Sequence, residues 1–576
     1  MWRSRAAAVA VLAGLSSVLC FYGLGANGVH EADEALHVRA SLEMFQAGAW
    51  WSPTAFGESY YNKPALPLWL MAVSYRLLGP TVFAARLWPA AFAVAAVLAT
   101  FALGAARKVS AGFVAGLMLA TTYPFVYIHC ARTADFDTLM LFSFVGSTIL
   151  FVRALDTNRG WVACAALAAL ASHGKNFAGT VPALVFVLAT VLCRPRYRPT
   201  RRCAVLCGCV FIAVNLAWLA PAAALHGWPF LHQYVGEEVL ARPYRPGSLT
   251  VAGAFRTYGW RFVVGFFPWS IVALLALFED VRKAIRHRDS LSVVTLCWIA
   301  VLSIVLCTVL RQGHQWYATP LFPFFAVSAA RFLVGPDARP TWSQRLRSAA
   351  CLLAVAAAIG LQISPDANPF VLLSPPRPMV LSRAGLPRAL LLSAVALAGA
   401  IAGARLSRWP GTATLRRGLQ LELVTVLVLS VAALLDVLRP LAMVDYRNAY
   451  ERVRETLISA RGARTGMLVV SMPAKYNNAL TRYYFGDLPG LQTEYLLNAP
   501  RAAVARTRRA PGLAFCLLIS ELRQVPLRFA SSGETIASAE ERRPSGAPTV
   551  YLSLLKIDRP ALPRGDGVAA GSREAR

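Results

Sequence analysis

Long blocks of mostly apolar residues recur along this 576-residue chain, and they constrain its fold more than any other feature. Each block is about 17–22 residues long, the length at which an α-helix crosses the hydrocarbon core of a bilayer. A soluble chain of this size would instead divide into domains of roughly 100–200 residues with alternating polar and apolar faces. Only 15% of the residues are charged, and they lie between the blocks. The sequence therefore predicts an all-α polytopic membrane protein and excludes a soluble enzyme.

The apolar blocks predict about thirteen membrane-spanning helices, of which the fifth and sixth are short enough to be tilted or re-entrant. The first block follows Arg3 and Arg5 and could be a cleaved signal peptide, but its length favours a retained anchor. The predicted spans are 6–26, 84–104, 110–128, 138–155, 161–174, 177–193, 203–225, 260–278, 291–310, 315–334, 347–363, 387–404 and 419–437.

Basic residues dominate the charge: 58 Lys and Arg against 29 Asp and Glu give a net charge of +29. Such an excess can indicate nucleic-acid binding, but here it lies in the short connections between apolar blocks, which argues against that class. With the N-terminus inside, every second connection is basic, as the positive-inside rule requires. The opposite connections hold the acidic residues and most of the histidines. The polar chemistry is therefore expected on the outer side of the membrane.

The composition changes after residue 439 to that of a soluble domain. We predict a transmembrane catalytic domain over 1–439 and a small extracytoplasmic α/β domain over 440–576, with a disordered tail. Amphipathic spacing predicts a helix, and short apolar runs predict buried strands. These elements are a helix over 446–460 and strands over 467–472, 513–520 and 549–555.

The first outer connection, 27–83, is too long and too varied to be a simple tether. From Glu34 to Gln46 the apolar spacing predicts a helix lying in the membrane interface. Asp33 stands at the N-terminus of that helix. A carboxylate in that position is either a helix cap or a catalytic group, and spacing alone does not separate the two.

Three further outer connections combine carboxylates with cations. The segment 129–138 holds Arg132 and Asp137 within ten residues, and Lys175 lies between two apolar blocks. An ammonium is costly there unless it has a partner. Arg311 and Tyr317 stand in a segment with two prolines. Each group alone could be a juxtamembrane anchor. Because all of them are predicted on the same side of the membrane, we expect one site with carboxylates beside cations.

Five short sequences in this order resemble the ArnT-like and protein O-mannosyltransferase superfamily, over about the first 330 residues. The resemblance implies a GT-C fold and transfer of a sugar from a polyprenyl-phosphate donor, and the outer C-terminal domain is most similar to the aminoarabinose branch. The sequences are Asp33-Glu34-Ala, Tyr60-x-x-Lys63-Pro64, Ala131-Arg132-Thr-x-x-x-Asp137-Thr, Lys175 and Tyr317-x-x-Pro320-x-x-Pro323.

The resemblance also implies roles for individual residues. Asp33 would be the leading catalytic carboxylate, because an acceptor hydroxyl needs a base, with Asp137 as a second acidic position and Glu34 as an orienting group. Cations would stabilise the phosphate leaving group. The donor-phosphate ligands would be Lys63, Lys175, Arg311, Tyr317 and Arg132, although Arg132 could equally pair with Asp137.

Two positions depart from the family pattern. Asn62 stands where relatives often have an acidic residue, and Leu36 with His37 follows the Asp-Glu pair where the aminoarabinose branch tends to have Arg and Tyr. His30, His37, His129, His173 and His314 could supply metal ligands, but they show no HxxxH spacing. We therefore assign no metal or other cofactor, and we expect a site at Asn62 to hold divalent cations weakly, because hard cations prefer carboxylates.

The resemblance thus implies an integral glycosyltransferase of the inner membrane that acts by an inverting displacement, and the charge distribution places its site on the periplasmic side. No G-x-G-x-x-G fingerprint for a nucleotide sugar follows a strand. The acceptor could be lipid A, another envelope glycolipid or a protein, and the oligomeric state stays open. Two other functions remain: a polyprenyl-lipid transporter, although no internal repeat is evident, and a non-catalytic protein that binds lipid-linked sugars.

Overall fold

The computed structural model describes most of the first 334 residues and shorter segments of the rest. The chain divides into two compact units, one of Met1–Val29, Leu36–Tyr446 and Pro544–Ala547, the other of His30–Ala35, Arg447–Arg543 and Pro548–Arg576. The described residues are 2–26, 28–29, 32–176, 178–193, 196–241, 244, 248–287, 289–334, 351, 354–355, 425–426, 429–431, 449–460, 466–471, 482–484, 493–497, 513–520, 534–541 and 550–556.

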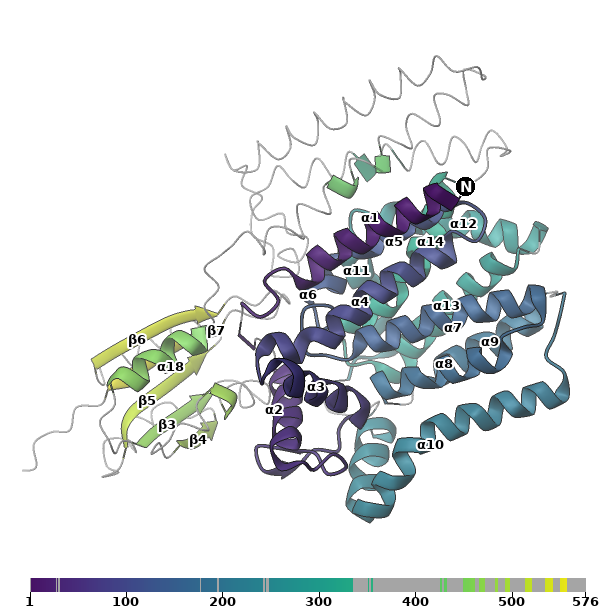
Figure 1. Ribbon diagram of the computed structural model, residues 1–576. Helices are drawn as coiled ribbons and strands as arrows, with labels where there is room; N and C mark the ends of the chain where they lie inside the picture. Colours follow the sequence, from purple (N-terminus) through teal and green to yellow (C-terminus); the bar gives the residue numbers. More distant parts are fainter. Residues whose placement is uncertain are drawn as a thin grey trace, which may run out of the picture. The chain divides into compact units, whose positions relative to one another are not determined.

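The described part of the first unit is a bundle of helices with one short hairpin (Figure 1). The elements are α1 (Trp2–Phe21), α2 (Ala32–Ala47, which begins in the segment 30–35), β1 (Thr54–Ala55), β2 (Glu58–Ser59), α3 (Ala65–Leu78), α4 (Val82–Gly104), α5 (Val109–Ala120), α6 (Tyr123–Tyr127), α7 (Asp137–Thr157), α8 (Trp161–Gly174), α9 (Thr180–Leu192), α10 (Arg201–Leu231), η1 (His232–Leu240), α11 (Val251–Gly265), α12 (Ser270–His287), α13 (Ser290–Ile304), η3 (Val305–Leu310), η4 (Gln315–Leu321) and α14 (Phe322–Val334).

Five helical segments among the described residues are long and apolar enough to cross a membrane, namely Val82–Gly104, Asp137–Thr157, Arg201–Leu240, Ser290–Leu310 and Trp316–Val334. They confirm the predicted apolar helices at these places. The expected spans 6–26, 110–128, 161–174 and 177–193 coincide with shorter apolar helices. Those over 347–363, 387–404 and 419–437 lie almost entirely outside the described residues. The chain is a multi-pass membrane protein.

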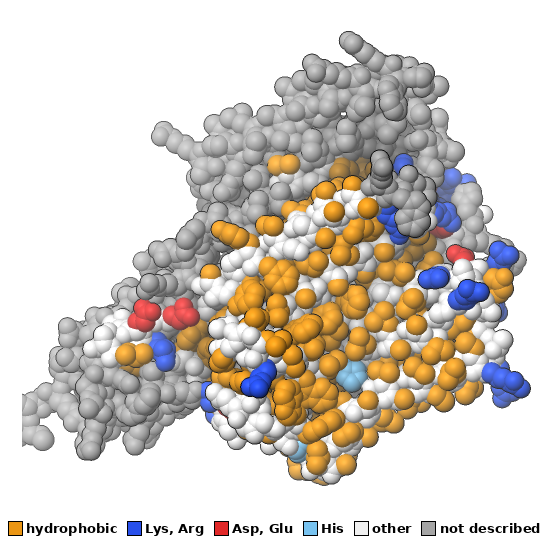
Figure 2. All heavy atoms as spheres, in the orientation of Figure 1, with side chains coloured by type: hydrophobic (Ala, Val, Ile, Leu, Met, Phe, Trp, Pro, Cys, Tyr) orange, Lys and Arg blue, Asp and Glu red, His pale blue; other side chains and the backbone are white. Residues whose placement is uncertain are grey.

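The space-filling view agrees with a bundle in a bilayer. Hydrophobic side chains are spread over the coloured part of the face shown in Figure 2, and many of the coloured Lys and Arg side chains gather along its right edge. Large apolar side chains such as Leu184, Val187 and Val191 on α9 are more than half exposed. In water such a surface would be unfavourable, whereas hydrocarbon chains can cover it.

The predicted span 260–278 is not one straight helix. Two helices, α11 and α12, meet there at an angle of 112° across a short break. Pro268 lies in the break and has no backbone N–H to continue a helix. The sequence hides this bend because the apolar residues continue through Phe266 and Phe267 without interruption.

The first outer connection is folded. A helix is present where the sequence predicts one, as α2, and a second helix, α3, follows the hairpin. The place of α2 in the membrane interface stays a prediction. The Glu43 carboxylate accepts hydrogen bonds from Thr54 Oγ1 (2.7 Å) and from the backbone of Phe56 (2.8 Å), and it pairs with Arg39 (2.5 Å). Burial alone would raise the pKa of Glu43, but these hydrogen bonds and the Arg39 charge lower it. Glu43 therefore fixes the hairpin against α2.

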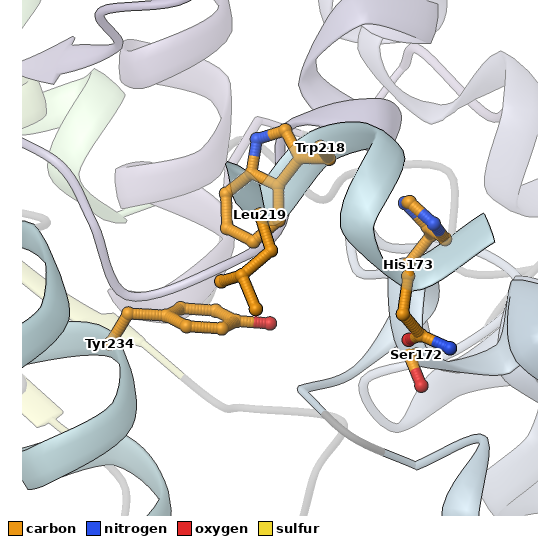
Figure 3. Close-up of a pocket in the computed structure, with 6 residues that line it drawn as sticks. Ser172, His173, Trp218, Leu219 and Tyr234 are labelled. Atoms are coloured by element: carbon orange, nitrogen blue, oxygen red, sulfur yellow. The ribbon is translucent and has the colours of Figure 1, made fainter. Parts of the chain in front are cut away.

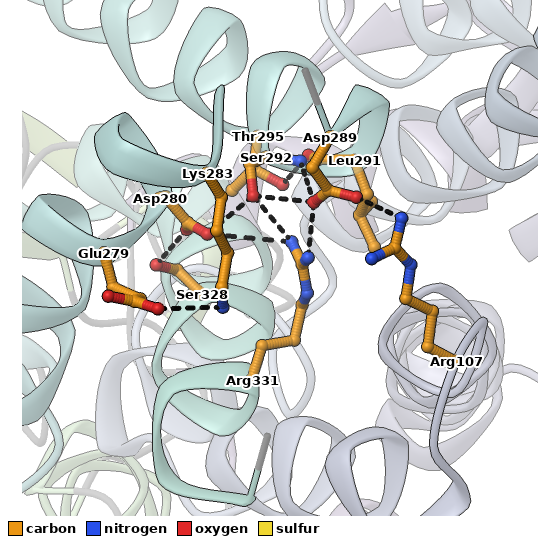
Figure 4. Close-up of polar contacts among 10 residues, drawn as sticks. All are labelled: Arg107, Glu279, Asp280, Lys283, Asp289, Leu291, Ser292, Thr295, Ser328 and Arg331. Carbon is orange, nitrogen blue, oxygen red and sulfur yellow. Dashed lines mark hydrogen bonds and ion pairs between the residues drawn. The ribbon is translucent and has the colours of Figure 1, made fainter. Parts of the chain in front are cut away.

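An ion network joins α12, α13 and α14 near one end of the bundle (Figure 4). Arg331 donates to Asp289 at 2.5 Å and to the Ser292 hydroxyl at 3.1 Å. Asp280 accepts from Ser292 and Ser328 and lies 3.6 Å from the Arg331 guanidinium. Arg107, from the connection after α4, also pairs with Asp289. Connections that the sequence places on the inner side therefore meet in one network.

Replacement of Arg331 by methionine should destabilise the protein, because it removes the Arg331 cation from the buried Asp280 and leaves Asp289 with Arg107. Breaking such a pair typically costs about 3–5 kcal/mol. Thermal unfolding of the full chain in detergent would measure the change. Arg153→Met, at an exposed position of α7, is the matched control and should shift the midpoint little. Equal midpoints for both variants would contradict a structural role for the network.

Asp289 should also make the stability depend on pH. Burial would raise its pKa, but Arg331, Ser292 and Arg107 outweigh burial and lower the pKa to about 2. A carboxyl whose pKa is lower in the folded chain stabilises it above the unfolded value of about 4. We therefore expect this stabilisation to disappear as the pH falls from about 4 to 2, and Asp289→Asn should lack that part of the acid dependence in a pH series of unfolding midpoints.

The second unit contains a five-stranded mixed sheet in the order β4-β3-β5-β7-β6. Its elements are α18 (Ala449–Ala460), β3 (Gly466–Ser471), β4 (Thr493–Leu497), β5 (Leu513–Ser520), β6 (Glu534–Glu541) and β7 (Val550–Lys556). Strands β3, β5 and β7 coincide with predicted strands, whereas β4 and β6 were not predicted. These two are the edge strands, and their less apolar sequences lack the pattern of central strands. The domain boundary at 440 stays a prediction.

Candidate functional site

The first unit contains a cavity of about 210 Å³ between α7, the α8–α9 connection, η1 and the α13–η3–η4 segment. Its walls are mostly apolar, and its polar groups include two carboxylates, an ammonium and a phenol. The apolar walls are formed by Met140, Phe144, Ala178, Val181, Val239, Leu302, Val305, Leu306, Val309, Leu310 and Pro320, and the polar lining by Asp137, Lys175, Asn176, Thr180, Glu238 and Tyr317. A cavity of this kind has room for a ligand with a long apolar part and a polar head that can contact the ammonium.

Asp137 and Lys175 form an ion pair in this cavity. The Lys175 ammonium lies 2.5 Å from Asp137 Oδ1, and Lys175 is 19% exposed whereas Asp137 is 3% exposed. Asp137 is the first residue of α7, and Lys175 directly follows the last residue of α8. A carboxylate is favourable at a helix N-terminus and a cation at a C-terminus. The helix ends therefore place both charges, and the ammonium remains open to a ligand.

Tyr317 is the third predicted residue in the cavity. The Lys175 ammonium lies 5.0 Å from the centroid of its ring, within the range of a cation–π interaction. The neighbouring Trp316 stacks on the imidazole of His129, with ring centroids 4.5 Å apart and planes 6° apart. Both aromatic residues belong to η4, so this helix presents one ring to each of two nitrogen-bearing side chains.

Beside Asp137, imidazole and carboxylate side chains alternate in the order Asp137, His129, Asp135 and His37. His129 Nδ1 donates to Asp137 Oδ2 at 2.9 Å, and His129 Nε2 lies 3.1 Å from Asp135 Oδ1. His37 Nδ1 lies 3.2 Å from the same Asp135 oxygen. All four side chains are buried. Sequence reasoning treated His129 only as one of several possible metal ligands, although its position eight residues before Asp137 was a usable signal.

Asn62 connects the first outer loop to this region. Its backbone carbonyl accepts from Asn176 Nδ2 at 3.1 Å, and its side-chain carbonyl accepts from Gln233 Nε2 at 2.7 Å. The side-chain oxygen that a metal would need is thus engaged. No group of three His, Cys, Asp or Glu side chains able to hold a metal occurs among the described residues. These residues do not fit a divalent cation, and weak binding at Asn62 stays a prediction.

Arg132 lies elsewhere than expected. Its guanidinium donates to the backbone carbonyls of Leu19 (2.9 Å) and Cys20 (3.3 Å), and the side chain is 8% exposed. These carbonyls belong to the last turn of α1, where such groups have no partner within the helix. Arg132 therefore caps α1 instead of pairing with Asp137, and the structure gives no support for its predicted role at the donor phosphate.

The remaining predicted residues lie in several places. Arg311 is half-buried and directly follows Leu310 of the cavity wall, and its backbone carbonyl accepts from Leu249 at 2.7 Å. Lys63 is half-buried in the loop beside Asn62. Asp33 and Glu34 lie in the first turn of α2, in a segment that groups with the second unit. The roles of all four stay predictions.

A second cavity lies between α8 and the α10–η1 region. Figure 3 shows Trp218, Leu219 and Tyr234 across from Ser172 and His173. Its volume of about 10 Å³ holds roughly one water molecule, which is too small for a sugar or a lipid. His173 Nε2 donates to the Val214 carbonyl at 2.9 Å. We therefore interpret His173 as a core histidine and not as the metal ligand that remained possible from sequence.

Comparison with known proteins shows which families this chain is similar to. Residues 62–219 match the family model described as dolichyl-phosphate-mannose-protein mannosyltransferase. The chain is 25% identical over 327 residues, 55% of its length, to an uncharacterized protein of Aquifex aeolicus strain VF5. It is 25% identical over 250 residues, 40% of its length, to undecaprenyl phosphate-alpha-4-amino-4-deoxy-L-arabinose arabinosyl transferase 2 of Pseudomonas fluorescens strain Pf0-1. These matches span 62% and 44% of the two relatives.

A solved structure covers almost the whole chain. The crystal structure of ArnT from Cupriavidus metallidurans bound to undecaprenyl phosphate superimposes with a TM-score of 0.62 at 18% identity. The superposition covers 95% of this chain and 97% of that one. At this identity the likeness shows a shared fold.

Proposed function

Since this chain is a GT-C membrane protein of the ArnT-like and protein O-mannosyltransferase superfamily, we propose that it transfers a sugar from a polyprenyl-phosphate donor to an acceptor in the cell envelope. The main observation behind the proposal is a cavity that Lys175 lines together with mostly apolar side chains. A polyprenyl phosphate has a matching distribution of charge and apolar surface. A nucleotide sugar would leave those walls without a ligand to cover them.

In this proposal the cations bind the phosphate that leaves. As the bond between the anomeric carbon and the phosphate oxygen breaks, negative charge grows on the phosphate, and a fixed ammonium stabilises it. Lys175 is the leading residue for this role, with Tyr317 beneath its ammonium. Lys63 and Arg311 are the further proposed phosphate ligands. Asp137 holds Lys175 in place through the 2.5 Å ion pair.

Asp33 is the proposed catalytic base, with Glu34 as an orienting neighbour. The acceptor hydroxyl oxygen attacks the anomeric carbon, the bond to the phosphate breaks, and the hydroxyl proton passes to the Asp33 carboxylate. One displacement of this kind inverts the anomeric configuration. Asp33 is half-buried in the first turn of α2, where the helix dipole favours the ionised carboxylate that a base requires.

The donor sugar could be a pentose or a hexose. The name of the Pseudomonas relative contains 4-amino-4-deoxy-L-arabinose, and this sugar is our first choice for a test. The proposed acceptor is a lipid A-type glycolipid or a protein on the periplasmic side of the inner membrane.

Reconstituted protein should transfer the sugar without a nucleotide. The full chain in lipid nanodiscs would be given undecaprenyl-phosphate 4-amino-4-deoxy-L-arabinose or an undecaprenyl-phosphate hexose, together with lipid A or envelope peptides. Release of undecaprenyl phosphate and a mass increase of the acceptor would support the proposal. Transfer from a nucleotide sugar without a lipid carrier would contradict it. Movement of the donor between leaflets without its consumption would favour the transporter alternative.

The orientation can be tested separately. Glu58→Cys, in the exposed hairpin, and Arg196→Cys, in the exposed α9–α10 connection, offer matched reporters on opposite predicted sides. In intact spheroplasts an impermeant maleimide should label the Glu58→Cys variant above the background of the native cysteines. The Arg196→Cys variant should exceed that background only after lysis. The reverse result would contradict the periplasmic assignment.

A further inference from the structure

A third cavity lies between α3, α4 and the segment that leads into α7. Its volume of about 10 Å³ holds roughly one water molecule. Apolar side chains of the two helices, among them Met71 and Phe92, form most of its lining. Three further lining residues, Trp88, Asp135 and Thr138, carry groups that can form hydrogen bonds. The cavity is therefore small but not purely apolar.

Two of these polar groups lack a protein partner. The indole nitrogen of Trp88 and the hydroxyl oxygen of Thr138 are both buried, and neither has a hydrogen-bond partner among the described residues. Buried polar groups in native proteins are nearly always hydrogen-bonded, because an unpaired group loses its contact with water and gains nothing in return. Since the indole nitrogen is buried, a lipid head group does not reach it. A small molecule inside the cavity can.

Asp135 contributes the third polar group. Its side chain is completely buried, and the two oxygens of a carboxylate offer about four acceptor positions. Its neighbours include His129 at 3.1 Å and His37 at 3.2 Å. A hydrogen bond from a molecule in the cavity adds to such contacts without replacing them.

The chemistry of the lining selects water as that molecule. An indole N–H can only donate, a carboxylate can only accept, and a hydroxyl can do both. One water molecule can accept from Trp88, donate to Asp135 and share a hydrogen bond with Thr138. Three partners are typical of a buried water. A metal ion would instead face the positive end of the indole N–H.

We propose that this cavity binds one ordered water molecule, which joins the Trp88 indole of α4 to the Thr138 hydroxyl of α7 and to the Asp135 carboxyl group. The inference uses only the cavity and the groups that line it. It is independent of the proposed function.

The water has a definite place in the packing of the bundle. Helices α4 and α7 lie against each other, and the rings of Phe92 and Phe142 are 5.9 Å apart. Thr138 directly follows Asp137, which pairs with Lys175 in the large cavity. The water therefore ties α4 to the end of α7 that carries this ion pair.

The bound water can be detected directly. We expect proton-detected NMR of the full chain in nanodiscs to show transfer of magnetisation from water to the Trp88 indole N–H. The spectrum of Trp88→Phe identifies this signal by subtraction. The backbone N–H of Glu58, in the exposed hairpin, is the positive control. Transfer to Glu58 without transfer to Trp88 would overturn the proposal.

Thr138→Val distinguishes a hydrated cavity from a dry one by the sign of its effect. Valine keeps the shape of threonine but lacks the hydroxyl. If the hydroxyl binds water, its loss should lower the unfolding midpoint, whereas removal of an unpaired hydroxyl should raise it. Thr100→Val is the matched control, because the buried Thr100 hydroxyl donates to the Ala96 carbonyl at 2.8 Å. We expect both variants to unfold at lower temperature. A midpoint of Thr138→Val equal to or above that of the unsubstituted chain would overturn the proposal.

A double variant tests whether one water serves both groups. Trp88→Phe removes the indole N–H, and Thr138→Val removes the hydroxyl. If the two groups share a water, the combined shift in midpoint should be smaller than the sum of the single shifts, since the first substitution already disturbs it. Additive shifts would contradict the shared water. A midpoint that falls when Na⁺ and K⁺ are replaced by choline would show a metal ion in its place and would also overturn the proposal.

Discussion

Asp33→Asn should lower the rate of sugar transfer by about a hundredfold to ten-thousandfold, the usual loss when a general base is removed. Asparagine has nearly the shape of aspartate and is tolerated equally well at the start of a helix. Only the proton acceptor is lost. The measurement is single-turnover transfer by the purified variant, beside its unfolding midpoint and its affinity for undecaprenyl phosphate.

The two accompanying measurements separate chemistry from structure. If Asp33 only stabilises α2, the substitution should cost no more than about 1 kcal/mol in stability and leave turnover nearly normal. Near-normal turnover would therefore contradict the catalytic assignment. Asp137 would then be the next carboxylate to consider, but its two oxygens already face Lys175 and His129, so a base would have to be sought elsewhere.

Lys175→Met should cause the largest loss of donor affinity. Methionine keeps the length and apolar character of the side chain but removes the charge, and it leaves Asp137 buried without its ammonium. Removing one partner of such a pair costs about 2–5 kcal/mol, or roughly thirtyfold to several-thousandfold in affinity. Titration with undecaprenyl phosphate in nanodiscs would measure this loss.

Two further variants complete this comparison. Lys175→Arg keeps the charge and should recover part of the affinity, although its planar group fits the site less well. Lys108→Met, at an exposed position after α4, removes the same charge far from the cavity lining and should bind normally. Equal affinity in Lys175→Met and the unsubstituted chain would contradict the assignment of this cavity to a phosphate.

The hydrophobic pattern of the sequence predicted the long membrane-spanning helices. The apolar blocks behind α4, α7 and α13 are long and have clear ends, so their helices appear where expected. The bend between α11 and α12 was missed because apolar residues continue across it. Pro268 is the residue that indicates a helix break there. The edge strands β4 and β6 were missed because an edge needs less apolar surface than the centre of a sheet.

In the site, too, some residues were predicted from the sequence and others were not. Charges and a hydroxyl beside apolar blocks, together with the resemblance to the superfamily, predicted Asp137, Lys175 and Tyr317 as site residues, and the structure brings these three together. Arg132 follows the same pattern, yet it turns to the end of α1, since nothing in the spacing showed which carbonyls needed a donor. The surroundings of His129 were not predicted, because the two carboxylates and the tryptophan near it meet only after folding.

The cavity walls have a consequence for how the protein meets its donor. Val309 belongs to the wall and is also 45% exposed on the apolar surface of the bundle, so the wall continues onto the side that faces hydrocarbon. A lipid donor would therefore arrive by diffusion within the leaflet. Its saturation curve would be governed by mole fraction in the membrane, and dilution of the nanodiscs or vesicles in buffer would leave the half-saturation point unchanged.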